Sequence, residues 1–599
     1  MPADASFAAG PGFGALFRMR PSPPRWPMGV RAAVSAAVPI LIGWATGDLG
    51  AGLIATLGAF TCRFGGDRPY LNRGTQLAVI AVTLAAAVTL GAWVAPIPWL
   101  AVTVVSVIAA TAVWLCAALS VGPPGAYIFV IVCAAGVGVS ASQLPPWQIG
   151  LLVLAGGALA WTTQMAGAFL DFRGPEKAAV AAAGDAVAAC AEHPEDPAVR
   201  DRAASALYRA WNVLVSYQPL AARPGGTLDR LRDANHALHV LFSTTLRAAD
   251  AARPVPPECA ATVRAVARLD LDPAGIAVRD RDRRALRPPR IPELLRQALA
   301  PGAHTRRVML RVAVAAPLAG ATAAITGVGH VYWAVAAAVL VLHTGIDRTA
   351  TLRRGTERLV GTWIGLVLAA AVLVVHPQGP WLALVVAALQ FVIEILVTRN
   401  YTLASVFITA AALTASTAAH RVDVGPIIVD RGLDTLIGCA VGIAVYLFTA
   451  PRQEAGRLGA AVADTLVEVA AVARYLCADT PATLAARAAR RDLQRAVLDL
   501  GAAYGAALGG TAGQTALAQQ LTATVSAAES LGYLMVTSCW AAEDGATTLL
   551  AEVDGDKYVA ALGELARKAR TGAPIAEELA LLTPTVSAGP GHPDAPLTE

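Results

Sequence analysis

Charged residues are scarce in this chain. Of its 599 residues, 15% are Asp, Glu, Lys or Arg and 56% are hydrophobic, whereas soluble domains carry about 25% charged residues. This composition indicates a protein that lies in a bilayer. The formal net charge of +5 is small for this length, and the basic residues stand beside apolar runs, so we do not expect nucleic acid as a partner.

Motifs for metal binding, ATP use and catalysis are also missing. The eight cysteines lie far apart, with no CxxC and no paired spacing, which argues against a disulfide framework or a zinc site. No GxxxxGK[ST] loop is present to bind the phosphates of ATP. His236 and His239 stand three apart without a third or fourth ligand nearby. Because no Ser-His-Asp or Cys-His arrangement is recognisable either, we expect no enzyme, no metal and no cofactor.

Long apolar runs, in contrast, are frequent. A helix needs about 20 apolar residues to cross the hydrocarbon core. Runs of about this length, or somewhat shorter, are predicted as spans at 28–46, 49–62, 76–95, 98–119, 124–141 and 148–170, and again at 308–326, 330–343, 358–375, 380–397, 402–419 and 428–449. The first run follows basic residues as a signal peptide would, but many further spans follow it, so we interpret it as the first span.

The two sets of spans carry a repeated motif. Gly65, Asp67 and Arg68 return 280 positions later as Gly345, Asp347 and Arg348, and Arg73-Gly74-Thr75 returns as Arg354-Gly355-Thr356. Both copies follow the second span of their set. The pattern predicts two tandem units of six transmembrane helices.

Arginines in alternate loops predict the orientation. They gather before the first span and after the second and sixth, while the intervening loops have almost none, with Arg421 the exception. Cytoplasmic loops keep Lys and Arg. We therefore expect the chain in the inner (plasma) membrane, with its termini and both polar stretches in the cytoplasm. Because each unit has an even number of spans, the two units are expected to be related by a pseudo-twofold axis along the membrane normal.

Two polar stretches with helical spacing of apolar residues complete the chain. The first has loops at Pro194, Pro224 and Pro254, and ends in an Arg-rich run from Arg279 to Arg290 that is expected to meet lipid headgroups, with regulatory binding as the alternative. The predicted all-α divisions are a cytoplasmic N-terminus 1–27, six spans 28–171, a cytoplasmic helical domain 172–306, six spans 307–450, a helical domain 451–585 and a disordered tail 586–599.

The second spans of both units are short. At about 14 residues, 49–62 and 330–343 fall below the length of a full crossing and are flanked by Gly. Short segments at matching places in two repeats point to a transporter's binding site, because broken helices expose backbone polar groups there. The alternative is a tilted or interfacial hairpin.

Four arginines follow these short spans. Under a pseudo-twofold, Arg68, Arg73, Arg348 and Arg354 would face one another as a basic ring that suits an anion, because guanidinium groups clamp carboxylates and stay charged. Asp67 and Asp347 could hold these side chains in orientation. Ordinary positive-inside anchoring with local salt bridges is the alternative.

Three ionisable residues fall within the later spans. Glu394 lies inside the tenth span, where a carboxyl must face a cavity, find a partner or bind a proton. It is a candidate proton carrier, with a static pair to an Arg of a neighbouring helix as the alternative. Arg431 and Asp434 stand three apart on one face of the twelfth span, and we expect an intrahelical ion pair.

With Gly-x-Asp-Arg and Arg-Gly-Thr after a short second span in each unit, and Arg399-Asn400-Tyr401 leading into a span with Phe407 and Thr409, the chain resembles the fusaric acid resistance and aromatic acid exporter family. The resemblance implies export of aromatic or other organic carboxylates, powered by the proton gradient, and adds Tyr401 to the arginines as a substrate-binding candidate. It also implies similarity to plant malate channels, which look like a dimer of the same six-span unit around an arginine-lined path.

The sequence thus favours an exporter of organic anions with proton coupling. Two alternatives remain, a passive anion channel and a membrane scaffold whose cytoplasmic helices dock partners. Expected partners are a small organic anion, the lipid bilayer, protons and a second copy of the chain.

Overall fold

The computed structural model describes residues 13–139, 144–276, 286, 290–327, 331–343, 347–417, 424–449, 456–543, 550 and 553–583. The repeated Gly345, the exception Arg421, most of the Arg-rich run and the predicted tail 586–599 lie outside these ranges. Within them every regular element is a helix, from α1 to α23 with short 3-10 and π turns, and no strand occurs. The all-α prediction is confirmed for the described residues.

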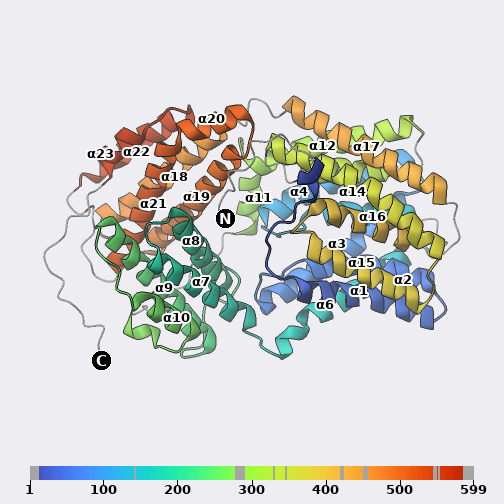
Figure 1. Cartoon of the computed structure of the whole chain (residues 1–599), viewed down its shortest axis with the longest axis horizontal. Helices are drawn as coiled ribbons and strands as arrows, with labels where there is room; N and C mark the ends of the chain where they lie inside the picture. Colours follow the sequence, from blue (N-terminus) through green and yellow to red (C-terminus); the bar gives the residue numbers. More distant parts are fainter. Residues whose placement is uncertain are drawn as a thin grey trace. The chain divides into compact units, whose positions relative to one another are not determined.

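Contacts divide the described residues into two compact units. One comprises those from Ala5–Phe172 and Pro289–Pro451, which we call the membrane unit, and the other those from Arg173–Pro288 and Arg452–Glu599, which we call the bundle unit. Figure 1 follows both along the chain. Each is described here by itself.

An apolar helix lies at each of the twelve segments where a span was predicted. In the first half of the membrane unit these are α1 Trp26–Ala45, α2 Leu49–Ala55 continued by the 3-10 turn η2 Thr56–Arg63, α3 Tyr70–Val94, α4 Pro98–Ala118, α5 Tyr127–Val139 and α6 Pro146–Met165. In the second half they are α12 His304–Ile325, α13 Tyr332–Leu342, α14 Arg348–Val375, α15 Pro380–Leu396, α16 Tyr401–Thr417 and α17 Val424–Thr449.

Seven of these helices are long and apolar enough to cross a membrane, namely α1, α3, α4, α6, α12, α14 and α17. The helices over Leu49–Arg63, Tyr127–Val139, Tyr332–Leu342, Pro380–Leu396 and Tyr401–Ala415 are shorter. The chain is therefore a multi-pass membrane protein, while twelve complete crossings stay a prediction.

Helices of the two halves pack against each other in reciprocal pairs. Helix α1 packs along α15, and α12 packs along α4, so the first helix of each half lies on the fourth of the other. Within the halves, α3 packs on α5 and α6, as α14 does on α16 and α17.

Glycines bring the short helices close to the last helix of each half. A Cβ at Gly156 of α6 would overlap the carbonyl oxygen of Ala55, and one at Gly438 of α17 would overlap that of Ala334 on α13. Small residues allow such backbone approach in membranes, where helices associate by packing rather than by the hydrophobic effect. The short helices are therefore fixed closely against the last long helix of their own half.

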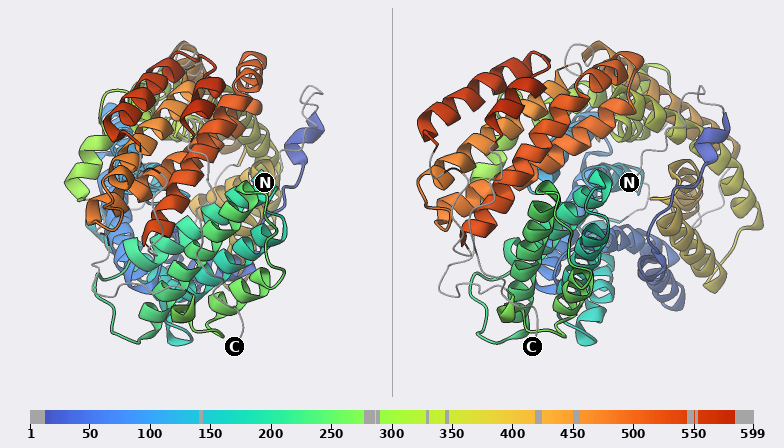
Figure 2. Two further views of the ribbon diagram at one scale, coloured as in Figure 1. Left: turned by 90° about the vertical axis from the view of Figure 1, so that its left-hand side faces the viewer. Right: turned by 60° about the vertical axis from the view of Figure 1, so that its left-hand side comes forward.

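The bundle unit consists of two helical groups (Figures 1 and 2). The first holds α7 Gly174–Glu192, α8 Pro197–Trp211 extended by the π turn η4 Asn212–Ser216, α9 Thr227–Asp250, α10 Cys259–Arg268 and the turn η5 Pro273–Gly275. The second holds α18 Arg457–Cys477, α19 Leu484–Leu508, α20 Ala512–Gln520, α21 Thr522–Glu543, α22 Gly555–Arg570 and α23 Ala576–Leu582. The predicted loops at Pro194, Pro224 and Pro254 are confirmed.

One large apolar core spans both groups. Helix α7 packs on α8, α9 and α10, as α18 does on α19, α21 and α22, and the groups meet where α9 lies on α21. Leu207, Leu238, Leu466 and Leu531 are among its fully buried residues. Burial of such side chains is worth about 1.5–3 kcal/mol each, so both groups fold around a shared core.

One helix lies in a different division from the predicted one. The sequence interpretation placed residues up to 306 in the polar domain, whereas α11 Ile291–Ala298 belongs to the membrane unit. It packs on α4 and α12, and the indole Nε1 of Trp114 donates to the carbonyl oxygen of Leu295 at 3.1 Å.

Candidate functional site

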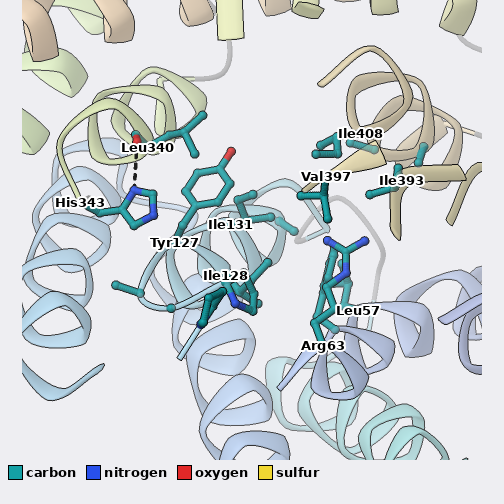
Figure 3. Close-up of a pocket in the computed structure, with 18 of the residues that line it drawn as sticks. Leu57, Arg63, Tyr127, Ile128, Ile131, Leu340, His343, Ile393, Val397 and Ile408 are labelled. Atoms are coloured by element: carbon teal, nitrogen blue, oxygen red, sulfur yellow. Dashed lines mark hydrogen bonds between the residues drawn. The ribbon is translucent and has the colours of Figure 1, made fainter. Parts of the chain in front are cut away.

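A cavity of about 930 Å³ lies between the two halves of the membrane unit. Its wall is formed by residues of α2, η2, α4 and α5 from the first half and of α12 to α17 from the second. Figure 3 shows Arg63 and Leu57 on one side of the space and Tyr127 and His343 on the other. The volume falls within the range of about 300–1,000 Å³ typical of small-molecule sites.

Positive charge predominates in the wall. Five arginines line the cavity against two carboxylates, Glu394 and Asp434; the arginines are Arg25, Arg63, Arg354, Arg358 and Arg431. Intramembrane charges are costly unless they are paired or functional. A cavity with this surplus suits a negatively charged ligand.

Aromatic rings support two of these arginines. The guanidinium carbon of Arg354 lies 3.4 Å from the ring centroid of Tyr401, and that of Arg431 lies 3.3 Å from the ring of Trp333. Cation–π contacts of this kind hold a guanidinium without using its N–H donors. The donors remain for a ligand.

Buried donors without partners lie in the same wall. The Nε atoms of Arg354 and Arg358 and the hydroxyl of Tyr401 make no hydrogen bond within the described residues. The Nη1 of Arg358 donates to the Ser405 hydroxyl at 3.2 Å. Since buried polar groups are nearly always bonded, these donors indicate a place for an acceptor.

Glu394 joins three separate elements of the unit. Its Oε1 lies 2.9 Å from the Nε of Arg63 at the end of η2. Its Oε2 accepts from the Nη2 of Arg25, which directly precedes α1, at 3.4 Å. The Nη2 of Arg63 also donates to Gln390 at 2.8 Å. The sequence left two interpretations of Glu394 open, a proton carrier and a static pair with an Arg of a neighbouring helix. The structure shows pairing with arginines outside α15, and the role of Glu394 in carrying protons remains a prediction.

Asp434 has no such partner. The residue is fully buried, lines the cavity, and neither carboxylate oxygen makes a hydrogen bond within the described residues. Although Arg431 lies one turn away, its guanidinium stacks on Trp333. The expected intrahelical ion pair of Arg431 and Asp434 therefore has no hydrogen bond between the two side chains in the described structure.

The four arginines of the predicted ring lie in different places. Arg354 lines the cavity, but Arg68, Arg73 and Arg348 are not among its lining residues. Arg73 is buried and donates to the carbonyl oxygens of Gly65, Gly66 and Arg68 at 2.8, 2.8 and 2.9 Å. It thereby fixes the turn of the Gly-x-Asp-Arg motif.

The other members of the motif have structural contacts or are exposed. Arg68 donates to the carbonyl oxygen of Ser120 at 2.6 Å, and Arg348 and Asp67 are exposed. Asp347 caps α14, because its Oδ1 accepts from the backbone N–H of Ala350 at 2.6 Å. Arg68 and Arg348 are not among the residues that line the cavity, and the roles predicted for them and for the two aspartates remain predictions.

The Arg399-Asn400-Tyr401 motif connects the cavity to the N-terminal segment. The Asn400 Oδ1 accepts from the N–H of Leu403 at 2.9 Å, which caps the start of α16. Its Nδ2 donates to the carbonyl oxygens of Leu16 and Arg18 at 2.9 and 3.2 Å. We call residues 16–22 the strap, because the Asn400 side chain binds backbone carbonyls of this segment to the loop between α15 and α16.

Several lining residues were missed by the sequence interpretation. Arg25, Arg63 and Arg358 were used only to predict orientation, and Tyr127, Trp333 and His343 were not singled out. A usable signal was Glu394, because an intramembrane carboxylate needs a partner and Arg63 ends a short span. No group of three His, Cys, Asp or Glu side chains that could hold a metal ion occurs in the described part of the chain.

Residues 318–445 match the family model described as "Fusaric acid resistance protein-like". This match confirms the resemblance noted in the sequence. This region contains Glu394, Tyr401 and Asp434. The chain is also 25% identical over 472 residues to "Uncharacterized membrane protein YvaC" of Bacillus subtilis (strain 168), covering 71% of this chain and 73% of that protein. No solved structure matches the chain.

Proposed function

Since the chain is a multi-pass membrane protein whose residues 318–445 are similar to fusaric acid resistance proteins, we propose that it transports organic anions, exporting carboxylic acids such as aromatic acids with coupling to protons. The observation that carries this proposal is the cavity with five arginines and two carboxylates. A transported anion needs a counter-charge inside the membrane, because an unpaired charge is costly there.

The composition of the wall favours a carboxylate attached to an apolar body. Arg354 and Arg358 offer N–H donors to the two oxygens, in the planar geometry that suits a carboxylate. Ile128, Ile131 and Leu340, which Figure 3 shows around Tyr127, form an apolar surface for a ring or chain. An aromatic acid has both parts.

The architecture proposed for this function is that of two six-span units around a central path. The reciprocal packing of α1 on α15 and of α12 on α4 supports a pseudo-twofold relation, because an exchange of the halves maps one pair onto the other. The cavity lies at their junction. An inner-membrane location with cytoplasmic termini is part of the proposal and rests on the distribution of arginines.

Binding of benzoate to the purified protein tests the site. The double substitution Arg354→Gln with Arg358→Gln should weaken binding at least tenfold, since a charge-assisted contact contributes about 1.5–3 kcal/mol. The control is Arg68→Gln with Arg348→Gln, which removes two arginines outside the cavity wall and should leave affinity unchanged. Equal affinity in wild type and the cavity variant would contradict the proposed site.

Flux in proteoliposomes separates the proposal from its alternatives. A coupled transporter accumulates labelled benzoate when a pH gradient is imposed, whereas a channel only dissipates the benzoate gradient. A scaffold gives no flux. The cavity variant should reduce any flux that occurs, and unchanged flux in that variant would place the path elsewhere.

A further inference from the structure

Arg63, Arg25 and Gln390 form a carboxylate site that is already filled by the protein itself. The Glu394 side chain is 3% exposed and that of Arg63 is 12% exposed. The carboxylate contacts a guanidinium on each oxygen, at 2.9 Å and 3.4 Å. Gln390, four residues earlier on α15, binds the same Arg63 at 2.8 Å and holds its orientation.

All four residues line the cavity. In Figure 3 the Arg63 side chain rises from η2 toward Ile393 of α15 and toward Val397, which directly follows that helix, on the opposite side of the space from Tyr127. Glu394 therefore occupies the Nε of Arg63, which a ligand carboxylate in the cavity would otherwise bind.

We infer that Glu394 is a tethered competitor for the anion, and that an anion and a proton consequently bind to the protein cooperatively. This inference rests on the proposed function. Two carboxylates cannot share one guanidinium at this distance without strong repulsion. The ligand carboxylate replaces Glu394, and the displaced Glu394, now without its counter-charges, binds a proton.

Few other ionisable groups lie on the elements next to Glu394. Helix α15 contains no other ionisable residue, α16 contributes Tyr401, and α1 contributes Arg31, whose Nη1 is bound to Gln164 at 3.1 Å. The turn η2 contributes the buried Cys62 thiol and Arg63 itself. Arg25, ahead of α1, completes the set.

Linkage then determines the sign of the coupling. If the proton on Glu394 strengthens anion binding, the anion strengthens proton binding by the same factor. The loaded protein carries both, so the species that crosses is the neutral acid. An inward proton gradient then opposes export, so net export is driven by an outward gradient of the anion that exceeds the proton gradient, and not by the protons.

The test measures affinity for benzenesulfonate at about pH 5.5 and pH 7.5, because the sulfonate group stays ionised in water at both values and its own charge therefore does not change. In the wild type the affinity should rise as the pH falls, by about 5- to 150-fold, the usual range of coupling between two sites. In Glu394→Gln the affinity should be high at both pH values. The control is Arg348→Gln, which should behave as the wild type.

A second variant guards against misfolding of the first. Glu394→Asp withdraws the carboxylate by one methylene, so it should raise affinity at pH 7.5 while the pH dependence remains. Anion binding that is independent of pH in the wild type, or unchanged by Glu394→Gln, would overturn the inference and leave the proposed function standing. If neither benzenesulfonate nor benzoate bound to the wild type at either pH, this result would instead overturn the proposed function.

Vesicles distinguish the direction of coupling. Cooperative binding predicts that labelled benzoate accumulates in proteoliposomes when the outside is acidic, with the same gradient across protein-free vesicles as the control for passive entry. Accumulation driven by an acidic interior would show exchange of anion against proton and would contradict cooperative binding.

Discussion

The guanidinium of Arg354 lies over the ring of Tyr401, with 3.4 Å between the guanidinium carbon and the ring centroid. Both residues line the cavity, and they come from α14 and α16. The contact fixes the direction of the arginine while its Nε stays without a partner in the described structure. The ring therefore prepares Arg354 for an anion before any ligand arrives.

Tyr401→Leu should weaken benzoate binding about fivefold, because a desolvated cation–π contact contributes about 1–2 kcal/mol. Tyr401→Phe keeps the ring and is the matched control. Its affinity should stay close to that of the wild type if the ring is the important part. Calorimetry on the purified protein measures both, and a Phe variant as weak as the Leu variant would assign the role to the hydroxyl.

Asp434→Asn should stabilise the protein. The carboxylate is fully buried and makes no hydrogen bond within the described residues, and an unpaired charge in such a place is costly. A neutral amide of the same size removes this cost, so we expect a gain of about 1–3 kcal/mol. Asp67→Asn, at an exposed position, is the control and should have no effect on thermal unfolding in detergent. A less stable Asp434→Asn protein would show that the carboxylate has a partner in the native protein.

Asn400→Ala should release the strap. Its side chain caps α16 and holds Leu16 and Arg18, and loss of a cap costs about 1 kcal/mol. Trypsin should then cut after Arg18 several times faster, whereas Arg20 precedes Pro21 and is not a trypsin site. Asn400→Asp keeps the cap but loses the amide donor, so it should also release the strap while α16 stays stable. Slow cleavage in both variants would show that other contacts hold these residues.

The bundle unit should lose stability in acid through His239. Its ring stacks on Trp540 with 4.7 Å between centroids, and burial, followed by the charges of Arg490 and His236, lowers the pKa of His239 from 6.5 to about 3. Below pH 6.5 the unfolded chain binds a proton that the folded chain does not. Stability is therefore complete above this pH and falls by about 1 kcal/mol per pH unit toward pH 3.

His239→Phe keeps an aromatic ring against Trp540 and cannot titrate. Hydrogen exchange of α9 and α21 in the full-length protein, corrected for the pH dependence of intrinsic exchange, should accelerate in acid for the wild type and less so for this variant. Glu529→Gln is the control, because it removes a group whose contribution to stability changes with pH in the other direction. Burial raises the pKa of Glu529 to about 7, so this group stabilises the folded state at low pH and loses that contribution as the pH rises, with the opposite sign. Identical acid sensitivity of wild type and His239→Phe would exclude His239.

Helix positions in the membrane unit followed from the sequence because apolar runs near 20 residues and Gly or Pro at their ends are local signals. Helices α1 and α4, for example, begin and end within two residues of the expected spans. The placement of α11 did not follow. Its partners α4 and α12 are far away in the chain, and no local pattern reveals them.

The repeated motif shows the limit of sequence reasoning for the site. Arg73 and Arg354 occupy the same place in the motif, and the sequence predicted one role for both. Arg73 meets three backbone carbonyls of its own turn, whereas Arg354 meets the ring of Tyr401. Likewise, the pair of Arg25 and Glu394 joins residues 369 positions apart, which depends on how α1 packs on α15.

The crossed pairing of α1 with α15 and of α4 with α12 also bears on biogenesis. Helix α15 is synthesised more than three hundred residues after α1. For most of synthesis, α1 therefore lies in the bilayer without its main neighbour. A chain that stops after α6 exposes two unsatisfied helix faces. The first half is therefore expected to depend on lipid, insertase or chaperone until the second half arrives, and truncated products should be targets for membrane proteases.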